Sequence, residues 1–126
     1  MERNKKIILF LALALFWTIS ITIACLVDMS TVPAANVENI DKFAHLAFYG
    51  IFSILWFLYL RNKIENTKKL FLVVFLLSVS FGIFIEFCQS TFTENRQADI
   101  NDAIANTIGA TIGLIIMSFF NRRVKK

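Results

Sequence analysis

Residues 70–92 read LFLVVFLLSVSFGIFIEFCQSTF, and they give the clearest indication of the fold class. It is long enough for an α-helix to cross a hydrocarbon core of about 30 Å. Glu86 is its only charged side chain. An ionisable group at membrane depth costs at least about 2.5 kcal/mol and is usually retained for a pathway, a site or a buried partner. The stretch therefore predicts a transmembrane helix, and the neighbours of Glu86 are expected to decide the function.

Three further apolar stretches flank this one, at Ile7–Val27, Phe43–Leu60 and Ala103–Phe120. The chain is 57% hydrophobic with a mean hydropathy of +0.66, which is too apolar for an ordinary soluble domain. Backbone groups in lipid must pair within their own segment, so each stretch is expected to be a helix. The sequence predicts an all-α membrane protein, one domain over residues 1–126 that forms a compact bundle of four transmembrane helices.

The basic residues predict the orientation of the bundle. Basic side chains concentrate on the cytoplasmic side of membrane proteins. Of the 13 Lys and Arg residues, all but Lys42 and Arg96 fall at the amino terminus, in the second connection or in the tail. Both termini are therefore expected in the cytoplasm. This orientation accounts for the positive net charge, so no nucleic-acid partner is expected.

The first apolar stretch has a rival interpretation as a secretory signal. A basic start, MERNKK, precedes it, and Thr22-Ile23-Ala24-Cys25 resembles a lipoprotein cleavage site. The stretch is longer than a typical signal core, however, and the position three before Cys25 is Thr22 rather than an aliphatic residue. We expect a retained transmembrane helix.

Cys25 and Cys88 both lie in apolar runs near the expected outer ends of their helices. They are interpreted as small buried hydrophobic residues. A disulfide bond on the outer side remains an alternative, and no zinc-binding spacing is present.

Polar side chains share one face of each of the last three helices, because they recur at helical spacing. The candidate site residues are Asp41, Lys42, His45 and Tyr49 around the second helix, Glu86 and Gln89 in the third, and Arg96, Asp99, Asn101, Asp102 and Asn106 before and within the fourth. Successive helices cross the membrane in opposite directions, so all of these residues are expected near its outer side. The inner halves of the same helices are almost purely apolar. The sequence therefore predicts an outward-facing polar site.

Structural roles compete with a functional one for several of these residues. Asp41 and Asp99 could be helix N-caps, and Lys42 could anchor its helix at the lipid headgroups. Glu86 lies too deep for a cap, so its structural alternative is an ion pair with Lys42 or Arg96. The glycines in Gly109-x-x-x-Gly113 are interpreted differently, as a small-residue face that packs the fourth helix closely against a neighbour.

Three blocks together resemble the VanZ-like family of small membrane proteins. The blocks are DKFAHLAFYG at Asp41–Gly50, EFCQ at Glu86–Gln89, and R-x-x-D-x-x-D-x-x-x-N-x-x-G-x-x-x-G at Arg96–Gly113. The family is named for an accessory protein of glycopeptide resistance that is associated with teicoplanin tolerance. The resemblance therefore implies a multi-pass protein of a bacterial inner membrane with a role in glycopeptide susceptibility at the cell envelope, but it implies no particular reaction.

The leading hypothesis is a pocket that binds or modifies a lipid-linked envelope molecule. Arg96, Lys42 and His45 could neutralise a phosphate, and Glu86 or Asp102 could act as general base. Glu86, His45 and Asp102 are thus the candidate catalytic residues, and the other polar residues are candidates for substrate binding. A divalent metal held by Asp41, Glu86, Asp99 and Asp102 is a further possibility, because hard cations prefer oxygen ligands.

Two alternatives remain open at this point. One is an envelope protein that binds a ligand or partner without catalysis. The other is a small transporter whose half-site is completed in a homo-oligomer. The apolar inner halves of the helices argue against the transporter, because they offer no continuous polar path.

Overall fold

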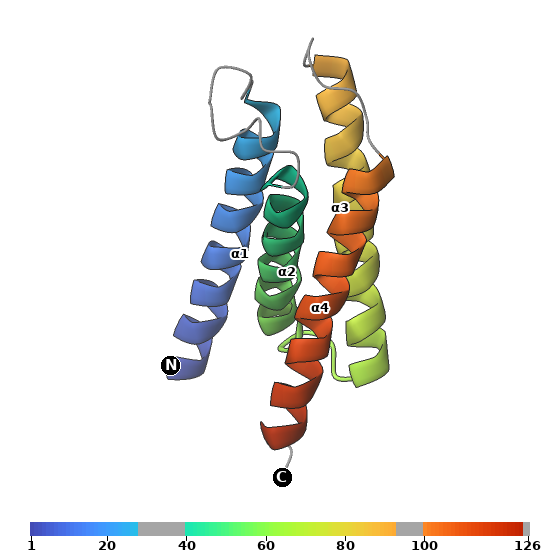
Figure 1. Ribbon diagram of the computed structural model, residues 1–126. Helices are drawn as coiled ribbons and strands as arrows, with labels where there is room; N and C mark the ends of the chain where they lie inside the picture. Colours follow the sequence, from blue (N-terminus) through green and yellow to red (C-terminus); the bar gives the residue numbers. More distant parts are fainter. Residues whose placement is uncertain (28–39, 93–99, 125–126) are drawn as a thin grey trace.

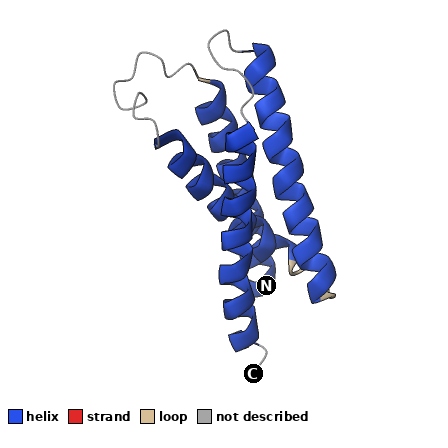
Figure 2. Ribbon diagram, turned by 45° about the vertical axis from the view of Figure 1, so that its right-hand side comes forward, coloured by secondary structure: helices blue, strands red, loops and turns tan. Residues whose placement is uncertain are grey.

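The computed structural model describes residues 1–27, 40–92 and 100–124, and these ranges contain four α-helices (Figure 1). The helices are α1 (Glu2–Leu26), α2 (Ile40–Leu60), α3 (Thr67–Phe92) and α4 (Ile100–Val124). All four are long and apolar enough to cross a membrane. The described residues form no strand, and Figure 2 shows helices joined by short loops in this part of the chain. The prediction of an all-α protein with four candidate membrane spans is confirmed.

Each helix begins three to five residues before the apolar stretch that predicted it. The added turns are polar, such as ERNKK at the start of α1 and TKK at the start of α3. Apolar runs mark only the part of a helix that meets hydrocarbon, whereas helical hydrogen bonding continues into the interface. The start of α2 at Ile40 places Asp41 inside the first turn rather than at the cap.

Both ends of the described chain lie at the same end of the bundle (Figure 1). The opposite end, which we call the distal end, is where α1 and α3 finish and where α2 and α4 begin. Helices α2 and α3 each contact all three other helices, and the most extensive contact in the bundle is the one between α2 and α4. Helix α1 lies at the edge, where only Ala14, Ile21 and Cys25 are buried.

Two indole hydrogen bonds attach α1 to α2. The Trp17 Nε1 donates to the carbonyl oxygen of Phe48 at 2.9 Å, and the Trp56 Nε1 donates to Thr18 Oγ1 at 3.1 Å. Such bonds satisfy donors that lipid could not, and they are a common means of joining helices whose surfaces are equally apolar. Trp56 therefore combines an aromatic contact with Phe52 and a polar contact with α1.

Helices α2 and α4 meet through their backbones. A Cβ atom on Gly109 would overlap the carbonyl oxygen of Leu46 and lie 2.9 Å from its Cα. On Gly113 a Cβ atom would overlap Ser53 Oγ and lie 2.5 Å from the carbonyl oxygen of Gly50. Only hydrogen fits at either position, so the small-residue face of α4 lies directly against the backbone of α2.

Substitution of Gly109 by alanine should destabilise the bundle, because backbone atoms of Leu46 cannot move aside as a flexible side chain can. Overpacking costs about 1–3 kcal/mol, and the G109A variant should lose at least that much free energy of unfolding in detergent or lipid. Ile112→Ala on the lipid-exposed side of α4 is the control and should be nearly neutral. Equal stabilities in a reversible unfolding assay would contradict the close contact.

Candidate functional site

The polar residues of α2 and α4 recur every four residues, and so do Glu86 and Gly82 of α3. Residues at this spacing lie on one face of a helix, so together they form layers along the bundle. The layer nearest the distal end, which we call the distal cluster, consists of His45, Glu86 and Asp102. One helical turn deeper, the second layer consists of Tyr49, Gly82 and Asn106.

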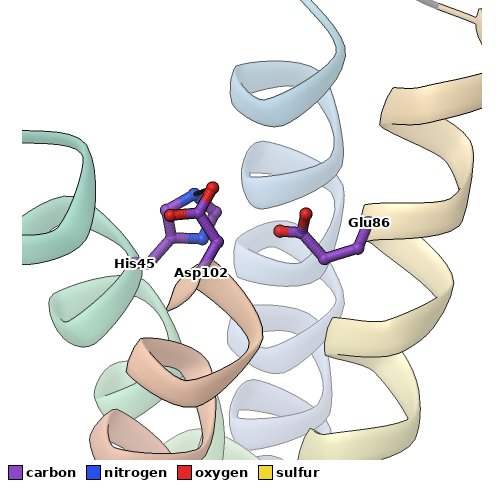
Figure 3. A group of neighbouring side chains, drawn as sticks. All are labelled: His45, Glu86 and Asp102. Carbon is purple, nitrogen blue, oxygen red and sulfur yellow. Dashed lines mark ion pairs between the residues drawn. The ribbon is translucent and has the colours of Figure 1, made fainter. Parts of the chain in front are cut away.

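The distal cluster brings three chemically reactive groups from three different helices together. One ligand atom of each residue lies within 4.8 Å of the others. The His45 Nε2 lies 3.8 Å from Asp102 Oδ2, and Glu86 points toward this pair from α3 (Figure 3). His45 and Glu86 are 5% and 6% exposed, whereas the side chain of Asp102 is 20% exposed and forms the more open side. The cluster is therefore buried at the distal end without being sealed.

Asn106 fixes the orientation of the His45 ring. Its Oδ1 lies 2.8 Å from His45 Nδ1, in a buried contact between α4 and α2. An amide oxygen can only accept a hydrogen bond, so Nδ1 donates and carries the proton. In the neutral ring the lone pair is then on Nε2, which faces the carboxylates. This arrangement suits a metal ligand or a general base, because both need an available lone pair.

The second layer holds unused hydrogen-bonding capacity. Tyr49 and Asn106 are almost fully buried, yet neither the Tyr49 hydroxyl nor Asn106 Nδ2 has a hydrogen-bond partner among the described residues. Leaving such a group unsatisfied costs about 1–3 kcal/mol. Gly82 makes room for both, because a Cβ there would lie 3.2 Å from Asn106 Nδ2 and 3.4 Å from Tyr49 Cε1. The layer therefore presents two hydrogen-bond donors below the distal cluster.

Polarity declines further toward the middle of the bundle. Ser53 and Ser78 are fully buried, but each hydroxyl donates to a carbonyl of its own helix. Beyond them, Phe57 and Val74 belong to an apolar core cluster. The described helices therefore contain a polar region at one end and offer no continuous polar route across the bundle.

An apolar groove adjoins the polar layers between α3 and α4. Its volume is about 260 Å³, and it is lined by Val79, Gly82, Ile83, Ile100, Ala103, Ile104, Thr107 and Ile108. Ile83, Ile100 and Ile104 are largely exposed, so the groove opens where a bilayer would place lipid chains. Gly82 lines the groove and also lies beside Tyr49 and Asn106, so the second layer adjoins the groove at this residue.

The remaining candidate site residues lie in different places. Lys42 and Asn101 are exposed on the first turns of α2 and α4. Gln89 is buried and turned toward α1, where its Nε2 donates to the carbonyl oxygen of Cys25 at 2.8 Å. Arg96 and Asp99 lie outside the described residues, as does the side chain of Asp41. Cys25 and Cys88 are both buried and are not bonded to each other.

The expected metal ligands are therefore found only in part. Glu86 and Asp102 do converge, and the structure adds His45 to them. Sequence reasoning also missed the groove and the position of Gly82 between the groove and the second layer. The available signal was a glycine one turn from Glu86 in a helix that is otherwise made of larger side chains.

Comparison with known proteins identifies one family. The sequence model of the VanZ/LLP1 family matches residues 2–121, which is nearly the whole chain. Comparisons with curated proteins and with solved structures gave no match.

The hydrogen bond between His45 and Asn106 should be measurable as a coupling energy. Polar pairs inside membrane bundles average about 0.6 kcal/mol and reach about 1.7 kcal/mol. A double-mutant cycle of His45→Ala and Asn106→Ala should give at least about 0.6 kcal/mol in reversible unfolding. His45→Ala combined with Trp56→Phe is the control, because those positions are about three helical turns apart. Additivity within about 0.3 kcal/mol in both cycles would refute the contact.

Proposed function

The chain belongs to the VanZ/LLP1 family, and from that premise we propose that it is an envelope protein whose distal site binds a lipid-linked envelope molecule. The observation that carries the proposal is the position of Gly82, which lines an apolar groove and lies beside the buried polar groups of the second layer. A lipid-linked precursor needs both kinds of surface, because its chain is apolar and its headgroup is charged. Affinity would come from the groove and selectivity from the polar groups.

The orientation follows from the charges. The distribution of basic residues supports an orientation with both termini in the cytoplasm and the distal end at the outer side of a bacterial inner membrane. Glycopeptides of the teicoplanin type act on the outer face of that membrane. A protein that binds a precursor there would alter how much of it such agents reach, which is the envelope role that the family name suggests.

The chain of the ligand would lie against Ile83 and Ile104, and its headgroup would reach the second layer past Gly82. The Tyr49 hydroxyl and the Asn106 amide would donate hydrogen bonds to phosphate oxygens. Lys42, exposed on the first turn of α2, would add positive charge, and Arg96 is a second cation for the same role. If the headgroup is also modified, Glu86 or Asp102 would be the base, but binding requires no such step.

Filling the groove should weaken lipid binding. In nanodiscs, a polyprenyl pyrophosphate should bind the wild-type chain and lose at least about tenfold in affinity with Ala103→Trp, which is a loss of about 1.4 kcal/mol. Ile112→Trp is the matched control, because it puts the same ring on the same helix outside the groove. Native mass spectrometry measures both, with the uncharged polyprenol as the headgroup control. Equal binding of polyprenol and pyrophosphate would count against a headgroup site.

Removal of the Glu86 charge should abolish function without removing the protein. In cells whose teicoplanin susceptibility falls when the chain is produced, Glu86→Gln should return the inhibitory concentration to that of cells lacking it. Glu65→Gln, in the exposed turn between α2 and α3, should keep the full effect at equal protein levels. A fully active E86Q variant would show that the distal cluster has no part in the phenotype.

A further inference from the structure

We infer that His45, Glu86 and Asp102 bind one divalent cation of the Zn²⁺ or Mn²⁺ type, and that this cation holds the phosphate of the lipid headgroup. The inference that a cation binds is drawn from the residues of the bundle and does not need the proposed function. The inference that it holds the phosphate rests on the proposed function and names the means by which the headgroup is held.

The ligand atoms already converge. One imidazole nitrogen and two carboxylate oxygens, each from a different helix, lie within 4.8 Å of one another. Around a tetrahedral metal at about 2.1 Å, ligand atoms lie about 3.4 Å apart. A side-chain rotation that moves a carboxylate oxygen of Glu86 or Asp102 by about 1.4 Å would bring the ligand atoms from 4.8 Å to this separation. Because the three helices are fixed by their own packing, the cation would bind a largely prepared site.

The His45 ring is oriented as metal-binding histidines are. Such residues almost always donate their second ring N–H to a carbonyl or a carboxylate, which fixes the ring and exposes the other nitrogen. Here the Asn106 Oδ1 receives Nδ1–H at 2.8 Å, and Nε2 faces Asp102. At 3.8 Å the Nε2 and Asp102 Oδ2 are too far apart for a hydrogen bond but well placed to share a cation.

The second layer provides an independent reason to expect a charged ligand. The three groups of the distal cluster can coordinate a metal ion or accept hydrogen bonds. One turn deeper, the Tyr49 hydroxyl and the Asn106 Nδ2 are buried hydrogen-bond donors without a partner among the described residues. Acceptors bind a cation and donors bind the oxygens of an anion. A metal ion with a coordinated phosphate or water satisfies both layers together, whereas a metal ion or an anion alone would satisfy only one.

The donor set selects the class of metal. A neutral imidazole suits borderline ions such as Zn²⁺, and carboxylates are shared by Zn²⁺, Mn²⁺ and Mg²⁺. Three protein ligands also leave a coordination position open for an external oxygen, as in sites where a metal acts on or holds a ligand. We therefore expect Zn²⁺ or Mn²⁺ to bind more tightly than Mg²⁺ or Ca²⁺.

The competing explanation is an ion pair that needs no metal. A doubly protonated His45 beside Asp102 would hold α2 against α4 by charge attraction alone. The two explanations differ in what happens when a metal is added and when the charge of Glu86 is removed. Only the metal site predicts a saturable stoichiometry that depends on all three residues.

The first experiment uses the metal alone. The full-length chain in nanodiscs, stripped with a chelator, is titrated with Zn²⁺ and with Mn²⁺ by calorimetry, and bound metal is counted by mass spectrometry. We expect one ion per chain, and an affinity lowered by at least about 100-fold in Glu86→Gln and in Asp102→Asn. Glu65→Gln is the control for surface carboxylates and should bind as the wild type does. Circular dichroism and gel filtration confirm folding, and Asp102→Asn keeps the test informative if the buried Glu86 variant does not fold.

Binding by the wild type that is absent, or that is unchanged in both variants, would overturn the metal site. The second experiment measures polyprenyl pyrophosphate binding before and after chelation, and we expect at least a tenfold loss that added Zn²⁺ restores. Pyrophosphate that binds equally well to metal-free protein would overturn the metal role and leave the proposed function standing. A metal site with no lipid binding under any condition would overturn the proposed function and leave the metal site standing.

Discussion

The backbone contact between α2 and α4 is the interaction on which the rest of the structure depends. Gly109 lies against Leu46, the residue that follows His45, and Gly113 lies against Gly50 and Ser53 one to two turns deeper. Because no side chain separates the helices there, their register is fixed to within a fraction of a turn. That register is what places Asn106 and Asp102 opposite His45. The third helix then adds Glu86, and its own glycine, Gly82, leaves room for the side chains of Asn106 and Tyr49 below the cluster.

The membrane raises the free-energy cost of leaving a polar side chain of the bundle without a partner. Lipid supplies neither water nor hydrogen-bond partners, so a polar side chain inside the bundle has to be satisfied by protein or ligand. Different buried polar side chains find their partners in different places. Ser53 and Ser78 bond to their own helices, and Trp17 and Gln89 bond to carbonyls of neighbouring helices. The Tyr49 hydroxyl and Asn106 Nδ2 have no hydrogen-bond partner among the described residues. Both residues lie beside Gly82, which lines the groove in which we propose that the lipid binds.

The sequence predicted the four spans because the thickness of a bilayer dictates the length of an apolar run, and it predicted the polar faces because helices repeat every 3.6 residues. It did not predict which polar groups meet, since that depends on how each helix is rotated against its neighbours. Gln89 lies only about 60° around α3 from Glu86, yet that rotation directs it to α1. The groove could not be predicted either, because Ile83 and Ile104 look like any other lipid-facing residues until α3 and α4 are placed side by side.

The central claim is that the distal cluster and the layer beneath it hold a ligand and do not simply close on one another. An experimental structure of the chain in lipid nanodiscs, determined with a polyprenyl pyrophosphate and at a resolution that separates side chains, tests this most directly. We expect density for a cation and a phosphate among His45, Glu86 and Asp102, continuing into a lipid chain between α3 and α4. Direct hydrogen bonds among these three side chains, with lipid absent from the groove, would contradict it.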